Sequence, residues 1–135
     1  HIGNVAIGRN CLLEKGVSIE NSHIGHTSLI ERNAEVKDSM IMSFSHIEHM
    51  VSIRRSIVGR HSTIEEHSVL GSETNDSLVA VIGENVNLPS DSVVSTGVRV
   101  APLKHSHSIL ATGRFVELGT DERNIYFAEK VSPRR

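Results

Sequence analysis

The feature that most constrains this 135-residue chain is an internal repeat with a period of 17 residues between positions 7 and 70. Aliphatic residues recur at this interval in three columns, which are Ile7, Ile24, Ile41 and Val58; Leu13, Ile30, Ile47 and Ile64; and Ile19, Val36, Ile53 and Leu70. Within one period the aliphatic positions are six, six and five residues apart, so the unit is a degenerate hexapeptide repeated three times per coil. The repeat therefore predicts a solenoid.

Small residues precede the aliphatic positions by two places. One such column holds Cys11, Ser28, Ser45 and Ser62. Alternate side chains of a strand point the same way, so each short strand sends one small and one aliphatic side chain inward. Coils stacked about 4.8 Å apart would then contain columns of Ile, Val and Leu beside hydrogen-bonded Ser. The predicted fold class is all-β: a single-stranded parallel β-helix of about five to six coils with a non-repeat C-terminal extension.

The pattern also predicts the domain organisation. We expect the β-helix over residues 1–103 and the extension over residues 104–135. A polar, Gly-containing stretch interrupts the period before it resumes at Ile82, which predicts an inserted surface loop within residues 71–81. Residues 109–118 favour one or two strands, whereas residues 120–130 indicate no clear element. Because Ile2 is already in register five residues before Ile7, we expect a further domain upstream.

Composition limits the binding partners and the cellular compartment that we expect for this chain. With 14 basic and 16 acidic side chains, the chain has no strong field that would attract nucleic acid or a membrane surface. The single cysteine, Cys11, excludes an internal disulfide, and its inward position favours structural burial over reactivity. The sequence shows no signal peptide and no long apolar run, so we expect a cytoplasmic protein.

Short motifs in the repeat carry a family resemblance. The pairs Ile7-Gly8, Ile24-Gly25, Val58-Gly59 and Ile82-Gly83 resemble the hexapeptide units of left-handed parallel β-helices, and this resemblance alone implies the left hand. Residues 39–49, 55–60 and 81–85 resemble the C-terminal domain of sugar-1-phosphate nucleotidyltransferases, in particular long-form glucose-1-phosphate thymidylyltransferase-like and ADP-glucose pyrophosphorylase-like proteins.

The resemblance implies a non-catalytic role in oligomerisation or regulation, downstream of a nucleotidyltransferase domain. The parent enzyme would convert an NTP and a sugar 1-phosphate into an NDP-sugar and pyrophosphate, with Mg²⁺ as cofactor. The expected partners are a second copy of the chain and the upstream domain. A Gly-rich nucleotide loop with its Lys is absent, so no catalytic, cofactor-binding or metal-binding residue is assigned here.

Two other functions remain open from the residues. Many hexapeptide proteins resemble acetyl-CoA-dependent acyltransferases that use a His as base, and His105 and His107 follow the coils. The nine histidines also allow a metal site similar to that of γ-class carbonic anhydrases. However, no two histidines lie 17 residues apart in one column, which argues against the metal site.

Two groups of residues are candidate interfaces. Glu14, Glu31, Glu48 and Glu65 are spaced 17 apart and form a carboxylate ladder. Like charges one coil apart repel, so we expect raised pKa values for Glu31 and Glu48 unless the ladder meets basic residues of a partner. The ladder is either a solvated edge or such an interface. Met42, Phe44 and Met50 are predicted to point outward around the third coil and form the second candidate contact.

Overall fold

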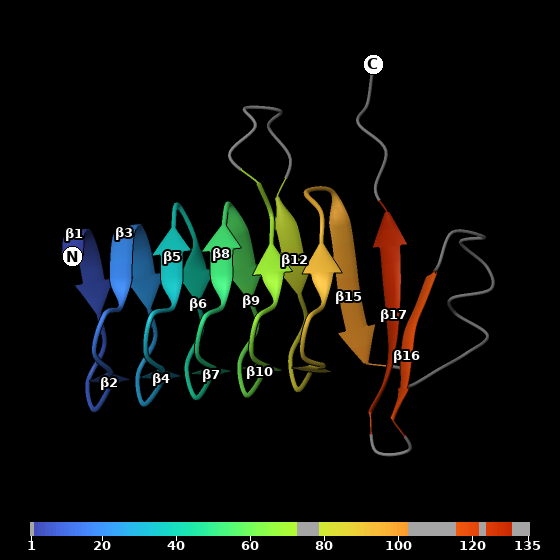
Figure 1. Ribbon diagram of the computed structural model, residues 1–135, viewed down its shortest axis with the longest axis horizontal. Coiled ribbons are helices and arrows are strands. Elements are labelled where there is room, and N and C mark those ends of the chain that lie inside the picture. Colours follow the sequence, from blue (N-terminus) through green and yellow to red (C-terminus); the bar gives the residue numbers. More distant parts are fainter. Residues whose placement is uncertain (1, 73–78, 103–115, 122–123, 131–135) are drawn as a thin grey trace.

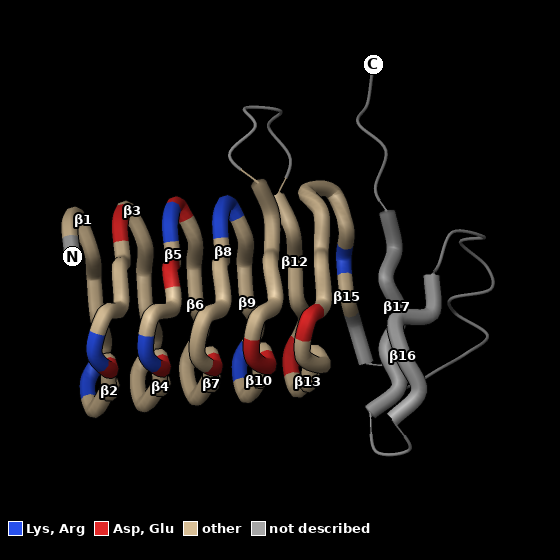
Figure 2. Tube along the Cα trace, in the orientation of Figure 1, with Lys and Arg blue, Asp and Glu red and all other residues tan. Residues whose placement is uncertain are grey.

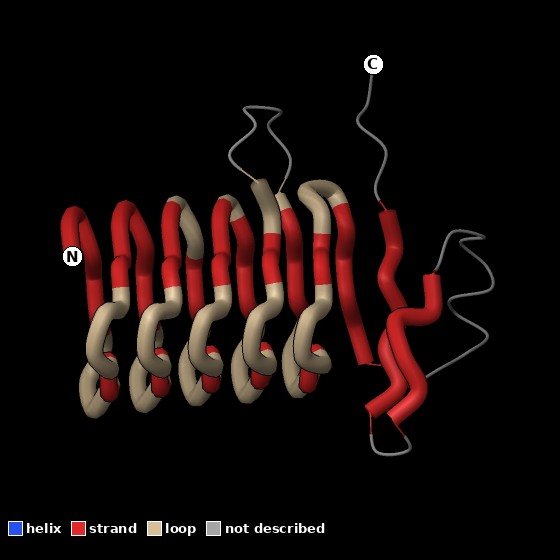
Figure 3. The backbone as a smooth tube through the Cα atoms, viewed as in Figure 1, coloured by secondary structure: helices blue, strands red, loops and turns tan. Residues whose placement is uncertain are grey.

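The computed structural model describes residues 2–72, 79–102, 116–121 and 124–130, and the repeat region forms a left-handed parallel β-helix (Figure 1). Three short strands make one coil, and the coils stack along the long axis of the molecule. Strands occupy the three faces, and turns lie between them (Figure 3). The predicted fold class is confirmed. Among the described residues, no helix is long and apolar enough to cross a membrane.

Two faces meet at a corner that the longest parallel strands follow. β1 (Ile2–Ile7) and β3 (Ser18–Ile24) run around this corner, because β3 pairs with β5 at its start and with β6 at its end. Face 1 contains the end of β3 followed by β6 (Met40–Ile41), β9 (Ser56–Val58), β12 (Ala80–Ile82) and β15 (Val98–Pro102). Face 3 contains the start of β3 followed by β5 (Glu35–Lys37), β8 (Ser52–Arg54), β11 (Val69–Leu70) and β14 (Val93–Val94).

Face 2 is a separate five-stranded sheet with one two-residue strand from each coil. Its strands are β2 (Leu12–Leu13), β4 (Leu29–Ile30), β7 (His46–Ile47), β10 (Thr63–Ile64) and β13 (Asn87–Leu88). The five strands correspond to about five coils, at the lower end of the predicted range.

Strand pairing follows the sequence period. Ile24 pairs with Ile41, and Ile41 pairs with Val58. After the insertion Ala80 pairs with Ser56. This separation of 24 positions exceeds the period by 24 − 17 = 7 residues. Because β12 already begins at Ala80, the insertion ends earlier than the predicted range of 71–81, and residues 73–78 lie outside the described residues.

The interior consists of aliphatic columns flanked by satisfied serines. Ile24, Ile41 and Val58 are fully buried. The hydroxyl of Ser39 donates to the carbonyl oxygen of Lys37 at 2.7 Å and accepts the backbone N–H of Ser56 in the next coil at 3.1 Å. The hydroxyl of Ser56 then donates to the carbonyl of Arg54 at 2.8 Å. Burying these hydroxyls therefore leaves no polar group unpaired.

The turns on both sides of face 2 depend on residues with positive φ. The turns that lead into the face contain Asn10, Thr27, Phe44, His61 and Asn85 at this position. The turns that leave it contain Gly16, Asn33, Met50, His67 and Asp91. Gly and Asn adopt this conformation readily, whereas a β-branched residue such as Thr27 rarely does. Stacking of identical turns holds the unfavourable residues in place.

The last strands leave the parallel pattern. β17 (Asn124–Lys130) pairs antiparallel with β15, and β16 (Val116–Asp121) pairs antiparallel with β17. Residues 120–130, for which the sequence indicates no clear element, thus contribute mainly to a strand. Of residues 109–118, only 116–118 are described, and they belong to β16.

Candidate functional site

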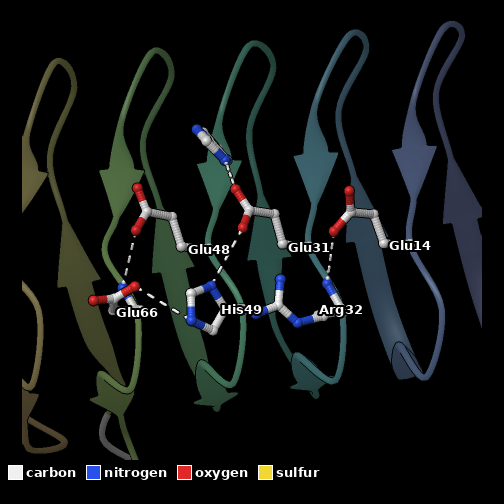
Figure 4. A network of polar contacts seen from close by, with 7 residues as sticks. Glu14, Glu31, Arg32, Glu48, His49 and Glu66 are labelled. Atoms are coloured by element: carbon white, nitrogen blue, oxygen red, sulfur yellow. Dashed lines mark hydrogen bonds and ion pairs between the residues drawn. The ribbon is translucent and has the colours of Figure 1, made fainter.

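The carboxylate ladder lies directly after the strands of face 2. Glu14, Glu31, Glu48 and Glu65 follow β2, β4, β7 and β10, and Pro89 takes the equivalent place in the fifth coil. The carboxylates bond toward the next coil (Figure 4). Glu14 Oε1 accepts the backbone N–H of Arg32 at 3.0 Å, and Glu48 Oε1 accepts that of Glu66 at 3.2 Å. These backbone donors offset part of the repulsion expected between stacked carboxylates.

Glu31 is held by imidazoles instead of a backbone amide. Its Oε2 contacts Nε2 of His46, and its Oε1 lies 3.5 Å from Nδ1 of His49. Nε2 of His49 lies 3.2 Å from Oε2 of Glu66, so His49 bridges two carboxylates from successive coils (Figure 4). The ring of His67 meets His49 edge-on at a centroid distance of 5.6 Å.

The expected rise in the pKa of Glu31 is wrong. Burial acts to raise this pKa, but hydrogen bonds and positive charge from His46 and His49 outweigh it, and the net shift is downward. Counting residues 17 apart identifies His49 as a neighbour of the ladder but misses His46. His46 lies two places before Glu48, at the outward site of β7, and a long side chain there reaches the carboxylate one coil back.

Phe44 and Met50 lie on the same coil, in the two turns that border face 2. Both side chains are about half exposed, at 52% and 49%, and both have positive φ. The Phe44 ring stacks on His61 of the next coil, with ring centroids 4.9 Å apart and an interplanar angle of 4°. Met42 is less exposed and occupies a place that is Gly25 and Gly59 in the adjacent coils. Met42 and Phe44 thus lie in the turn that leads into the face, and Met50 lies in the turn that leaves it.

The described residues offer no obvious chemistry of their own. Across residues 2–72, 79–102 and the two last strands, no group of three or more His, Cys, Asp and Glu could hold a metal ion. Both ring nitrogens of His49 contact carboxylates, so the ring is held between Glu31 and Glu66. Cys11 is half-buried, with its Sγ 3.1 Å from the carbonyl oxygen of Gly25. His105 and His107 lie outside the described residues.

Comparison with known proteins gives a family and a fold. The family model described as the GMPPB C-terminal domain matches residues 1–115. No curated protein sequence matches the chain.

Solved structures that share the fold include three with TM-scores of 0.50 to 0.55. AntD, an N-acyltransferase from Bacillus cereus, is 16% identical with a TM-score of 0.55, over 83% of this chain and 80% of AntD. A putative acetyltransferase from Desulfovibrio desulfuricans is 19% identical with a TM-score of 0.53, over 96% of this chain and 31% of that protein. WeeI from Acinetobacter baumannii is 17% identical with a TM-score of 0.50, over 74% of this chain and 50% of WeeI. Identities this low support a common fold and nothing finer.

Proposed function

This chain belongs to the GMPPB C-terminal domain family, and we propose that it is the non-catalytic β-helix module of a sugar-1-phosphate nucleotidyltransferase. In this role it holds subunits together and stacks on a catalytic domain. The whole protein would form an NDP-sugar and pyrophosphate from an NTP and a sugar 1-phosphate, with Mg²⁺, in the cytoplasm. The catalytic step belongs to the other domain.

The match to the family model over residues 1–115 carries this proposal, and the first coil offers a surface for the catalytic domain. Ile7 is 40% exposed, whereas Ile24 and Ile41 in the same column are fully buried. Within the described residues, β1 pairs only with β3, so its other edge carries unpaired backbone groups. An apolar, hydrogen-bonding end of a solenoid is stable when a cap or a neighbouring domain covers it. We propose that the catalytic domain packs against this end.

A row of side-chain hydrogen bonds that begins in the first coil also supports docking at this end. Nδ2 of Asn4 donates to Oδ1 of Asn21 at 3.3 Å, and Nδ2 of Asn21 donates to Oδ1 of Asp38 at 3.2 Å. Each amide donates toward the later coil, so the Asn4 side-chain oxygen faces the same end of the β-helix and offers an acceptor to the catalytic domain.

The residues present do not fit a nucleotide and Mg²⁺. Nucleotidyl transfer requires a loop that cradles phosphates, basic side chains at the reacting phosphorus and a metal held by oxygen ligands. The sequence contains no Gly-rich loop followed by Lys. We therefore derive no step of the reaction from this chain.

Assays of the purified chain test the proposal. Two activities are measured, pyrophosphate release from an NTP and a sugar 1-phosphate, and acetyl transfer from acetyl-CoA. Sedimentation velocity is recorded in parallel at protein concentrations of roughly 1 to 100 µM. We expect neither activity and a concentration-dependent increase in sedimentation coefficient. Nucleotidyl transfer would overturn the non-catalytic role, acetyl transfer would favour the acyltransferase alternative, and a strict monomer would overturn the assembly role.

A further inference from the structure

The two sets of turns that border face 2 carry opposite charge. We call residues 8–10, 25–27, 42–44, 59–61 and 83–85 the entry turns, and residues 14–16, 31–33, 48–50, 65–67 and 89–91 the exit turns. The entry turns contain Arg9 and Arg60 with His26 and His61, against one acidic residue, Glu84. The exit turns contain the four ladder carboxylates with Glu66 and Asp91, against Lys15, Arg32, His49 and His67. Figure 2 shows charges of both signs around β2, β4 and β10.

Exposed apolar side chains lie on the same face. Leu12 is 60% exposed on β2, in the middle of face 2, and Leu29, which is partly buried, follows it one coil later. Phe44 in an entry turn and Met50 in an exit turn belong to one coil. The face thus has an apolar centre at its first coils, and its third coil has Met42 and Phe44 in one border and Met50 in the other.

From these observations we infer that face 2 binds face 2 of a second copy of the chain, with the twofold axis parallel to the solenoid axis. The inference rests on the proposed assembly role and specifies its surface. Under this symmetry each entry turn lies opposite the exit turn of the same coil in the other copy. Leu12 then meets Leu12 of the partner subunit on the axis.

The charge pairs that this symmetry creates differ from coil to coil. In the fourth coil Arg60, which also contacts Glu84 of its own chain at 3.3 Å, lies opposite the exit turn that holds Glu65 and Glu66 of the partner subunit. In the first coil Arg9 lies opposite an exit turn that contains Lys15 as well as Glu14 of the partner subunit, and in the fifth coil Glu84 lies opposite Asp91 of the partner subunit. In the third coil Phe44 lies opposite the exit turn that holds Glu48 and Met50 of the partner subunit, where the Met50 sulfur offers a favourable contact to the ring. The fourth coil therefore supplies the complementary charge that fixes register and orientation.

The other twofold arrangement of the same face is unfavourable. An axis perpendicular to the solenoid axis places exit turns against exit turns, so the ladder carboxylates of the two copies oppose one another. Like charges set opposite each other at an interface are strongly disfavoured. Charge therefore selects the parallel arrangement.

The size of the face sets the expected affinity. Five coils at about 4.8 Å each give a face about 24 Å long, which corresponds to an interface at the lower end of the usual range. We expect a dimer with a dissociation constant on the order of micromolar, weakened by salt because the bordering charges are exposed.

Charge reversal and charge swap test the pairing. Arg60→Glu and Glu65→Arg should each weaken dimerisation about tenfold, because each creates two like-charge contacts per dimer. The double variant R60E/E65R should restore the dissociation constant to within about threefold of the parent chain, since the charges across the interface are exchanged and remain complementary. Loss of the exposed Arg60–Glu84 pair is common to R60E and the double variant, so it does not account for a difference between them. Arg99→Glu on face 1 reverses the same charge elsewhere and should have no effect. Sedimentation equilibrium gives the constants, and thermal unfolding checks that each variant folds.

Cross-linking supplies a readout that does not depend on charge. Phe44→Cys and Met50→Cys are each introduced into a Cys11→Ser background, so that each variant has a single cysteine. Serine at position 11 matches Ser28, Ser45 and Ser62 of the same column. A short thiol cross-linker should join a mixture of the two variants but neither variant alone. If the chain dimerises, but the double variant does not restore affinity and the mixture of cysteine variants does not cross-link, the assignment of face 2 is wrong. The proposed assembly role is then unaffected. A strict monomer overturns both.

Discussion

The interior columns and the turns of this β-helix accept different ranges of side chain. One interior column reads Ile24, Ile41, Val58, Ile82 and Val100, and all five are buried. The entry-turn column reads Asn10, Thr27, Phe44, His61 and Asn85, although all five share positive φ. Each interior site is bounded by the same site one coil above and below, so its volume is fixed. A turn side chain projects into solvent, so its identity is free to serve recognition.

The largest difference between the two regions is expected for a buried charge. Ile41→Asp should unfold the domain, because an unpaired carboxylate in the core costs several kcal/mol. Met40→Asp, at the adjacent outward site that is 45% exposed, should change the melting temperature little. Thermal unfolding followed by circular dichroism compares the two variants. Equal shifts would contradict the assigned register.

A smaller effect is expected for the serine columns. Ser62→Ala removes a hydroxyl that donates to the Gly83 carbonyl at 2.7 Å and accepts the Val86 N–H at 3.2 Å. Both backbone groups then lose this partner in the interior, at a cost of about 1 to 3 kcal/mol in the free energy of unfolding. Ser52→Ala, at an outward site of β8, is the matched control. Urea denaturation of both variants measures the difference, and a cost no greater than the control would show that the column is not held by these bonds.

In the turns, one substitution is expected to stabilise the folded chain. Thr27 is β-branched and has a φ of 57°. Thr27→Asn places a residue that tolerates this conformation and should raise the free energy of unfolding by about 1 kcal/mol. Thr63→Asn in strand β10 has no such strain to relieve and should be neutral or unfavourable. If urea denaturation shows that Thr27→Asn destabilises the chain, contacts of the Thr27 side chain outweigh the backbone strain of the turn.

The smallest effect concerns the carboxylate ladder. Because the folded-state pKa of Glu31 lies below its ordinary value of 4.5, the carboxylate stabilises the fold above that pH. This contribution is lost as the pH falls through the folded pKa. Glu31→Gln should therefore destabilise the chain at pH 5 to 7 by less than about 1 kcal/mol, and the difference should vanish near pH 3. Glu65→Gln is the control. Stabilisation by Glu31→Gln would restore the repulsion interpretation.

Much of the interior was predictable from the sequence, because stacking transmits one constraint to every coil. The spacing of Ile24, Ile41 and Val58 gives the register, and Ile82 gives the point where it resumes. The handedness was not derivable from spacing and came from the resemblance of the hexapeptide units.

The turns and the C-terminal strands were harder to predict. Contacts such as Glu31 with His46 join positions 15 residues apart, so a search for column neighbours misses them. Strand β17 pairs antiparallel with β15 and obeys no repeat, so its mixed sequence gives no periodic signal.

Hydroxyl-radical footprinting of the self-associated chain tests most directly whether the turns of face 2 carry assembly. Met50 in an exit turn and Met40 on face 1 have similar exposed fractions, 49% and 45%, so their oxidation rates should be similar in the dilute monomer. On association the oxidation of Met50 and Phe44 should fall severalfold while that of Met40 stays unchanged. Protection of Met40 with unchanged oxidation of Met50 and Phe44 would contradict the account.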